Sequence, residues 1–290
     1  MVYAVVEILT QPIMIVHGSG WLIFADSFIK FPPSISQPLV SLYCASFGLC
    51  VSLLASHFVF RFVAICSPND IRKLEGWNLL KMYIFPVIFS VVWFLMGVIP
   101  SKPIDVKSEI PVNETYGENT FELGYVGMLY YHPSNSGETI IRWADFMACF
   151  TCCIIMQTCI TVMIVCGWKT YQKMGRLGSS MSIKTKDLNN QLFRALIIQT
   201  LVPILTMFTP VGLLLILPMF SIGVGTLANA PSLNAGIYPA LDATIVTFMI
   251  RDFRETVICR RRGPKVSFSA ATSEALYSVS AENHASGNLS

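Results

Sequence analysis

The sequence predicts an all-α membrane protein, a bundle of six membrane-crossing helices followed by a polar tail. Of the 290 residues, 53% are hydrophobic and only 13% are charged, whereas a typical soluble domain has about 25% charged residues. The charged residues are gathered in short blocks, and long uncharged runs separate these blocks. Runs of this length and composition are typical of helices that cross a bilayer.

The spans are expected wherever an apolar run reaches the length that a helix needs to cross the hydrocarbon layer, about 20 residues. We expect a transmembrane bundle with its basic flank over residues 1–262, and a disordered cytoplasmic tail rich in Ser and Ala over residues 263–290. The six predicted spans cover residues 2–25, 39–66, 79–99, 143–168, 192–217 and 231–250.

The first stretch, residues 2–25, is predicted as a span rather than as a cleaved signal peptide. It has no basic start, and Glu7, Gln11 and Pro12 interrupt its apolar run. A signal peptide has a charged start and a continuous apolar middle. Polar side chains within a span are expected to face the interior of the bundle.

The second stretch, residues 39–66, is predicted to be the central span, because small residues recur along it at helical spacing. Such a stripe lets neighbouring helices approach closely, so we expect other helices to enclose this span. The small residues are Ser41, Cys44, Ala45, Gly48, Ser52, Ala55 and Ser56.

The remaining spans are bounded by polar segments and by proline. Pro100 ends the third span, because proline cannot continue a helix. A long acidic insertion, residues 101–142, separates the third span from the fourth, and a basic loop separates the fourth from the fifth. The fifth span contains Pro203 and Pro210, and a short Gly/Ala connection leads to the sixth.

Basic residues predict the orientation of the bundle. They are concentrated in the connections after the second and fourth spans and at the start of the tail. Under strict alternation these segments share one side, which is therefore cytoplasmic. The loop of residues 101–142 then lies outside the cell, where Asn113 in the sequence Asn113-Glu114-Thr115 is a candidate glycosylation site. With six spans, both termini are expected to be cytoplasmic.

Two polar residues lie near the cytoplasmic end of the central span. His57 and Arg61 are four residues apart and share one helix face. They cannot pair with each other, so they need an acid, a carbonyl group or water from elsewhere. On position alone, the favoured interpretation of Arg61 is that it snorkels to the interface or anchors the positive side of the span; a functional role at this end of the bundle is the alternative.

The fifth and sixth spans carry further candidates for a conformational switch. Gln199 and Pro203 share a face, and Pro203 is expected to kink its helix. In the last span, Tyr238 and Pro239 precede Asp242, a carboxylate that needs a partner or a proton inside the membrane. A neutral, hydrogen-bonded structural role for Asp242 is the equally weighted alternative.

No catalytic, metal or cofactor motif is present in the sequence, and we predict that the protein is not an enzyme. The spacing of Cys149, Cys152 and Cys153 resembles a metal site, but neighbouring hard or nitrogen ligands are absent, so packing is the favoured interpretation. The basic segment 251–262 is expected either to lie along the inner leaflet, which would make Cys259 a candidate for palmitoylation, or to be a simple basic flank.

Three motifs, in order, resemble one family. The segment His57-Phe58-Val59-Phe60-Arg61-Phe62 is similar to the HFxYRY pattern in the third span of nematode serpentine chemoreceptors of class r, the str group. The run of residues 191–203 resembles the sixth span of that family. Residues 237–242, followed by Arg251-Asp252-Phe253-Arg254, resemble its seventh span and the start of its tail.

The resemblance implies a rhodopsin-like seven-transmembrane fold and a G-protein-coupled receptor that detects a small, often volatile molecule in chemosensory neurons. The expected partners are this ligand, a heterotrimeric G protein and the lipid bilayer, with no nucleic acid and no cofactor. The expected location is the plasma membrane of sensory cilia. Arg61 takes the place of the arginine that ends the third span.

The chain also departs from the family pattern. Its six spans correspond to the second to seventh of the family, so the first is expected to be absent. Ala243 follows Asp242 where the family usually has proline, and Phe62 stands where tyrosine is expected. The insertion of residues 101–142 contains no cysteine, so the disulfide of rhodopsin-like receptors cannot form there. A truncated, non-signalling relative is therefore one alternative, and a transporter or channel is a weaker one.

Overall fold

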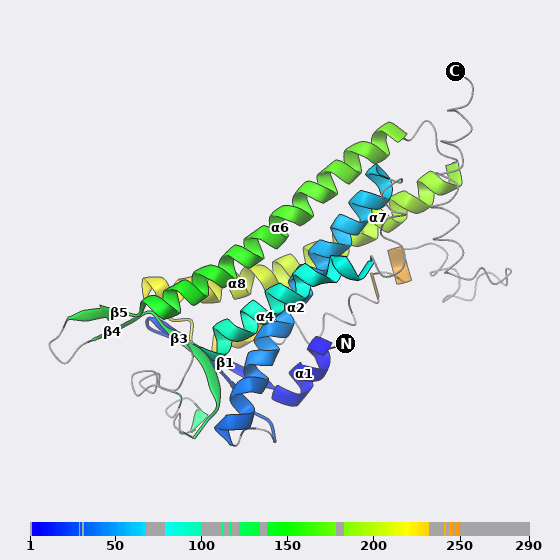
Figure 1. The fold of residues 1–290 in the computed structure, drawn as a ribbon. Coiled ribbons are helices and arrows are strands. Elements are labelled where there is room, and N and C mark those ends of the chain that lie inside the picture. Colours follow the sequence, from blue (N-terminus) through cyan, green and yellow to red (C-terminus); the bar gives the residue numbers. More distant parts are fainter. Residues whose placement is uncertain are drawn as a thin grey trace. The chain divides into compact units, whose positions relative to one another are not determined.

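The computed structural model covers the whole chain and is mostly helical (Figure 1). Its secondary structure is described for residues 2–28, 30, 32–67, 79–99, 112, 116–117, 122–133, 138–177, 183–231, 241, 244–245 and 247–249.

The described elements are long helices with two small sheets. The α-helices are α1 (Val2–Thr10), α2 (Pro33–Cys66), α4 (Lys81–Val98), α6 (Trp143–Leu177), α7 (Ile183–Pro203) and α8 (Thr209–Ile216). Shorter turns are the π-helical η4 (Ile204–Phe208) and the 3₁₀ segments η5 (Leu217–Phe220) and η6 (Thr226–Asn229). The strands are β1 (Pro12–His17), β2 (Gly20–Ala25), β3 (Tyr125–Leu129), β4 (Tyr131–Pro133) and β5 (Thr139–Ile141).

Four helical stretches in the described part of the chain are long and apolar enough to cross a bilayer. Each overlaps one of the predicted spans, and the predicted last span, residues 231–250, lies largely outside the described residues. The four stretches are Pro33–Cys66, Lys81–Val98, Trp143–Arg176 and Asn190–Phe220.

The prediction of a helical span over residues 2–25 is wrong. Helix α1 has 9 residues, which makes it about 14 Å long, too short to cross about 30 Å of hydrocarbon. It ends at Thr10, and the next residue, Gln11, has a φ of 43°, in the left-handed region. The chain then forms the hairpin β1–β2, with Gly18 at a φ of 52° in the turn. A short apolar run suits a buried strand as well as a helix, which is why hydropathy alone misassigned it.

The strands also correct the prediction of an all-α protein. Strands β1, β2 and β3 form an antiparallel sheet in that order, and β4 pairs with β5. In the larger sheet Trp21 is the register partner of Met128 and Leu22 is the partner of Gly127. The hairpin thus pairs with the segment that the sequence predicts to be an outer loop. Residues 12–25 and 125–129 therefore belong to one sheet, whereas the six-span topology places a membrane-crossing helix over residues 2–25. The orientation of the N-terminus stays a prediction.

The chain separates into two compact units. The first consists of residues 1–53, 85–159 and 202–239, and the second of residues 54–84, 160–201 and 240–290. Helices α2, α4, α6 and α7 each have residues in both units.

The first unit has a core between the sheet and the segment that precedes β3. One face of the sheet buries Leu22 and Phe24 from β2 together with Tyr125 from β3. Ile15 from β1, Val112 and Leu123 complete this core. Alternation along a strand sends the next side chains, including Trp21, to the opposite face of the sheet.

Small residues on α2 pack against α4 in the first unit, as the stripe along the central span predicts. A Cβ atom at Gly48 would lie 2.8 Å from Cε3 of Trp93, and one at Gly97 would lie 3.3 Å from Oγ of Ser41. The Ser90 hydroxyl donates a hydrogen bond to the carbonyl oxygen of Ala45 over 3.1 Å. The two helices therefore approach closely.

Replacing Gly48 with alanine is expected to destabilise the fold, because the added methyl group collides with the Trp93 ring. Overpacking of this kind costs about 1–3 kcal/mol of unfolding free energy. The measurement is the unfolding temperature of the purified chain in detergent. Gly175→Ala on α6 is the matched control, since a Cβ atom there meets nothing within 4 Å. Equal unfolding temperatures for the two variants would contradict the close approach.

Candidate functional site

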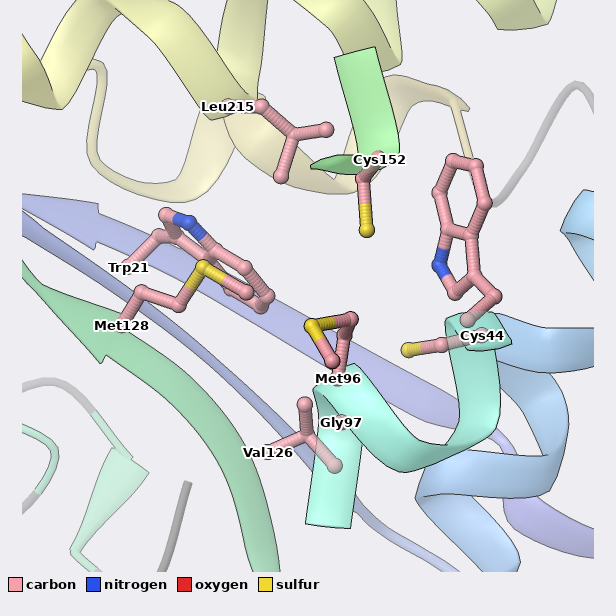
Figure 2. Close-up of a pocket in the computed structure, with 9 residues that line it drawn as sticks. Trp21, Cys44, Met96, Gly97, Val126, Met128, Cys152 and Leu215 are labelled. Atoms are coloured by element: carbon pink, nitrogen blue, oxygen red, sulfur yellow. The ribbon is translucent and has the colours of Figure 1, made fainter. Parts of the chain in front are cut away.

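A small cavity lies in the first unit between the second face of the sheet and the helices (Figure 2). Its volume is about 20 Å³. The residues around it come from six elements of this unit, two strands and four helices. They are Trp21 from β2, Val126 and Met128 from β3, Cys44 from α2, Trp93, Met96 and Gly97 from α4, Cys152 from α6, and Leu215 from α8.

The sheet register explains why the strand residues line this cavity. Val126 and Met128 are two residues apart and point to the same face of β3. Trp21 is the register partner of Met128 and lies on that face too. The intervening residues, Leu22 and Tyr125, point to the core on the other face. One short sheet therefore separates the core from the cavity.

Tyr130, which follows β3, ties the sheet to the helices. Its hydroxyl donates a hydrogen bond to the carbonyl oxygen of Leu215 over 2.8 Å and accepts one from Nε1 of Trp21 over 3.4 Å. Burial raises the pKa of the Tyr130 phenol above its ordinary value, so the donor proton is retained. Its backbone N–H donates to the carbonyl oxygen of Ser19 over 3.0 Å. Tyr130 thus links Trp21 of β2, Ser19 in the turn before β2, and Leu215 of α8.

Asp145 forms a second tie, in the first turn of α6. Its carboxylate is fully buried, and its Oδ2 atom accepts hydrogen bonds from the Leu129 backbone N–H and from Nε of Arg142, each over 3.0 Å. A carboxylate is favourable at a helix N-terminus because it faces the positive end of the helix dipole. The interaction fixes the end of β3 to the start of α6.

The lining of the cavity is uncharged. The described side chains around it are aromatic, aliphatic or sulfur-bearing, and Trp21 already donates its indole N–H to Tyr130. An ion with a full, hard charge would lose its hydration there without gaining a partner. The cavity suits a neutral or soft guest.

The second unit presents a cationic region at the end of α2. Arg61 is partly buried, and within the described part of the chain no hydrogen bond or ion pair is formed by its guanidinium group. Nζ of Lys169 lies 5.9 Å from the centroid of the Phe62 ring, a cation–π arrangement. The Cys66 thiol donates to the carbonyl oxygen of Lys169 over 3.9 Å. These contacts hold α2 against α6.

The structure places four of the switch residues that the sequence predicts. His57 is exposed on α2, and Gln199 is partly buried on α7; both share the second unit with Arg61. Pro203 is the last residue of α7, and the π-helical η4 follows it directly. A departure from α-helical bonding thus follows this proline, and the kink itself stays a prediction. The other predicted site residues lie outside the described residues: Asn113, Tyr238, Pro239, Asp242 and Cys259.

Sequence reasoning missed the residues of the sheet that shape the cavity. Trp21 was assigned to a helix, and Met128 and Tyr130 to a loop without structure. The Gly18-Ser19 pair between two apolar runs is the signal that would have indicated a hairpin. The partner of that hairpin is more than 100 residues away and has no local signal.

A family model described as the serpentine type 7TM GPCR chemoreceptor Str matches residues 1–258 of the chain. The serpentine receptor class r-10 of Caenorhabditis briggsae is 30% identical over 283 residues, which cover 94% of this chain and 82% of that protein. Its Caenorhabditis elegans counterpart is 27% identical, with 93% and 80% covered. The G-protein coupled receptor str-217 of C. elegans is 22% identical, with 88% and 74% covered. No solved structure matches the chain.

Replacing Tyr130 with phenylalanine is expected to destabilise the first unit, because the buried Leu215 carbonyl loses its stronger donor and keeps only the Cys149 thiol, whose sulfur lies 3.6 Å away. Loss of one such hydrogen bond costs about 0.5–1.5 kcal/mol. The measurement is the unfolding temperature in detergent, with Tyr131→Phe as the control. The Tyr131 ring packs 5.5 Å from Phe146, and this variant keeps that packing. If both variants unfold at the wild-type temperature, the hydrogen bond from Tyr130 to Leu215 does not stabilise the first unit.

Proposed function

The chain belongs to the Str family of serpentine seven-transmembrane G-protein-coupled chemoreceptors, and from this premise we propose that it detects a small, uncharged molecule and signals through a heterotrimeric G protein. It is a multi-pass membrane protein with apolar helices of spanning length. The proposal includes its placement in the plasma membrane of sensory cilia, with the end of α2 that carries Arg61 facing the cytoplasm.

The cavity beneath the sheet is the observation that carries the proposal. Six elements contribute to its lining, so a guest would contact all of them at once. The described lining offers no charge, which favours a neutral and largely apolar ligand. Concave and mostly apolar sites with few polar groups are where proteins bind small molecules.

The size of the cavity supports a link between binding and a change in packing. Its volume of about 20 Å³ is enough for roughly one water molecule. A larger ligand enters only if lining side chains move. Met96 and Met128 are the adaptable ones, because a thioether chain has three rotatable bonds and no branch. Ligand binding would therefore displace residues of α4 and β3.

A series of ring contacts leads from the cavity to η4. The Trp93 and Phe47 rings are 5.7 Å apart at an interplanar angle of 66°. The Phe47 and Phe208 rings are 5.6 Å apart at 85°. Phe208 is the last residue of η4, the π-helical turn that follows Pro203. We infer that displacement of Trp93 by a ligand is transmitted through Phe47 to this turn.

The π-helical turn is a suitable place for a helix to change shape. Pro203 has no N–H, so it cannot donate the hydrogen bond that a helix makes to the carbonyl four residues earlier. A π turn marks a local departure from α-helical bonding, and such turns are frequent at functional sites. A shift here would alter the course of the chain between α7 and α8.

The cationic region of the second unit fits the contact with a G protein. Arg61 offers five N–H donors in a planar fork, which suits carboxylates and backbone carbonyl groups of a partner. Lys169 adds a second cation near Phe62. In the family, an arginine ends the third span, and Arg61 stands in that place in the motif quoted above.

Filling the cavity should abolish the response to ligands. In Cys152→Phe the benzyl group takes up more space than the cavity offers, so a ligand is excluded. The assay expresses the full chain with a G-protein reporter, applies a panel of neutral volatile compounds, and measures surface delivery in parallel. Cys153→Phe is the control, because Cys153 is the next residue on α6 but does not line the cavity. A normal response from Cys152→Phe at normal surface levels would exclude this cavity as the ligand site.

Replacing Phe47 with leucine should weaken the response without removing it, because the ring contacts to both Trp93 and Phe208 are lost. We expect the half-maximal concentration of an active compound to rise by about tenfold, equivalent to about 1.4 kcal/mol of coupling. Phe150→Leu is the control, since the Phe150 side chain is 58% exposed on α6. If the two variants give the same dose–response curve, the ring contacts do not carry the signal.

A further inference from the structure

We propose that the cavity beneath the sheet is also a binding site for one soft, monovalent metal ion, Cu(I), held by sulfur atoms. Four of the lining residues carry sulfur, two as thiols and two as thioethers: Cys44, Cys152, Met96 and Met128. Nothing in the sequence alone groups these residues.

The four sulfur-bearing side chains come from four different elements and border one cavity. Cys44 is on α2, Met96 on α4, Met128 on β3 and Cys152 on α6. Figure 2 shows the Cys44, Cys152 and Met96 side chains extending toward the same space, and the Met128 side chain lying beside Trp21 at its border. Donors from separate elements can surround an ion, whereas donors from a single helix face reach it only from one side.

The size and polarity of the cavity favour an ion over water. A volume of about 20 Å³ accommodates roughly one water molecule, and a buried water needs 2–4 polar partners. The described lining provides aromatic, aliphatic and sulfur-bearing groups instead. Water would thus be poorly held, whereas a soft ion finds the ligands that it prefers.

The ligand set selects the metal. Thiolate and thioether donors bind Cu(I), whereas Ca²⁺ and Mg²⁺ require oxygen ligands. Structural zinc sites use four Cys, His or carboxylate ligands. Among the described residues there is no group of three or more His, Cys, Asp or Glu side chains placed to hold a metal. Two cysteines with two methionines satisfy Cu(I) and leave a zinc site incomplete.

The net charge of the occupied site also favours Cu(I). Binding of Cu(I) replaces the proton of one thiol: a copper–sulfur bond forms, the S–H bond breaks, and the proton leaves to solvent. The copper–thiolate unit is then neutral. The second thiol and both thioethers donate lone pairs without losing a proton. No oxidation or reduction takes place, and the uncharged cavity acquires no net charge, as an apolar environment requires.

The site is prearranged by the ties already described. The Tyr130 hydroxyl holds Trp21 and the Leu215 carbonyl, which both border the cavity, and Asp145 fixes the end of β3 close to Met128. These bonds position β3 relative to α6 and so bring the Met128 and Cys152 side chains to the same space.

Copper binding occupies the cavity to which we assign the ligand, but it is measured without a ligand or a G protein. The full chain is purified under reducing conditions in lipid nanodiscs and titrated with Cu(I) against a chromogenic Cu(I) chelator, and Ag(I) serves as a second probe. We expect one bound equivalent per chain. Because one proton is released, the apparent affinity should rise by about tenfold per pH unit.

Variants identify the site. Cys44→Ser with Cys152→Ser is expected to lose the bound equivalent. Cys153→Ser with Cys159→Ser, which changes two thiols of α6 that do not line the cavity, is expected to retain it. X-ray absorption at the copper edge should report sulfur neighbours only. Retention of the equivalent by the first pair, or its loss in the second pair, overturns the proposal.

A third variant keeps the test decisive if the serine pair does not fold. Met96→Leu with Met128→Leu preserves side-chain volume and both thiols but removes the thioether donors. We expect weaker Cu(I) binding with the same pH dependence and an unchanged unfolding temperature of the metal-free chain. Unchanged affinity in this variant would also overturn the proposal. A chain that binds no copper yet responds to volatile compounds would refute the metal site and leave the receptor function intact.

Discussion

The hydrogen bond from the Tyr130 hydroxyl to the Leu215 carbonyl oxygen is the interaction on which the first unit depends. At 2.8 Å it joins the chain just after β3 to the end of α8, and the same hydroxyl receives the indole N–H of Trp21. In a membrane protein a backbone carbonyl near a helix end must find a donor, because hydrocarbon offers none. Tyr130 supplies the shorter of the two hydrogen bonds to this carbonyl, the other coming from the Cys149 thiol, and it thereby fixes the sheet to the helices.

The sheet gives the first unit two distinct interiors. One of its faces is packed with Leu22, Phe24 and Tyr125 and provides stability. Its other face, with Trp21 and Met128, borders a cavity that is small, neutral and rich in sulfur. Because successive side chains of a strand point to opposite faces, three short strands are enough to create this division. The same geometry supports the proposals of a neutral ligand and of a soft metal ion, since both avoid introducing a charge.

Membership of the Str family gives these features a common purpose. A chemoreceptor has to convert the presence of a small molecule into a change elsewhere in its helices. A cavity that is nearly filled, bordered by flexible methionines and followed by packed aromatic rings suits such a conversion, because packed interiors respond to added volume by shifting rather than by compressing. The π-helical turn after Pro203 provides a place where the helix can yield.

Hydropathy determined the class of the protein and the positions of four apolar helices, and three local motifs were enough to indicate the family. These properties follow from the length of apolar runs and from short patterns, which are visible along the chain. Hydropathy misassigned residues 2–25, since the energetic advantage of burying an apolar run is the same for a helix and for a strand. It also gave no account of the cavity. The pairing of β2 with β3 joins segments about 100 residues apart, and the convergence of Cys44, Met96, Met128 and Cys152 depends on that pairing. Only the tertiary structure decides such contacts, because hydrogen bonds between distant backbones carry no signature in the local sequence.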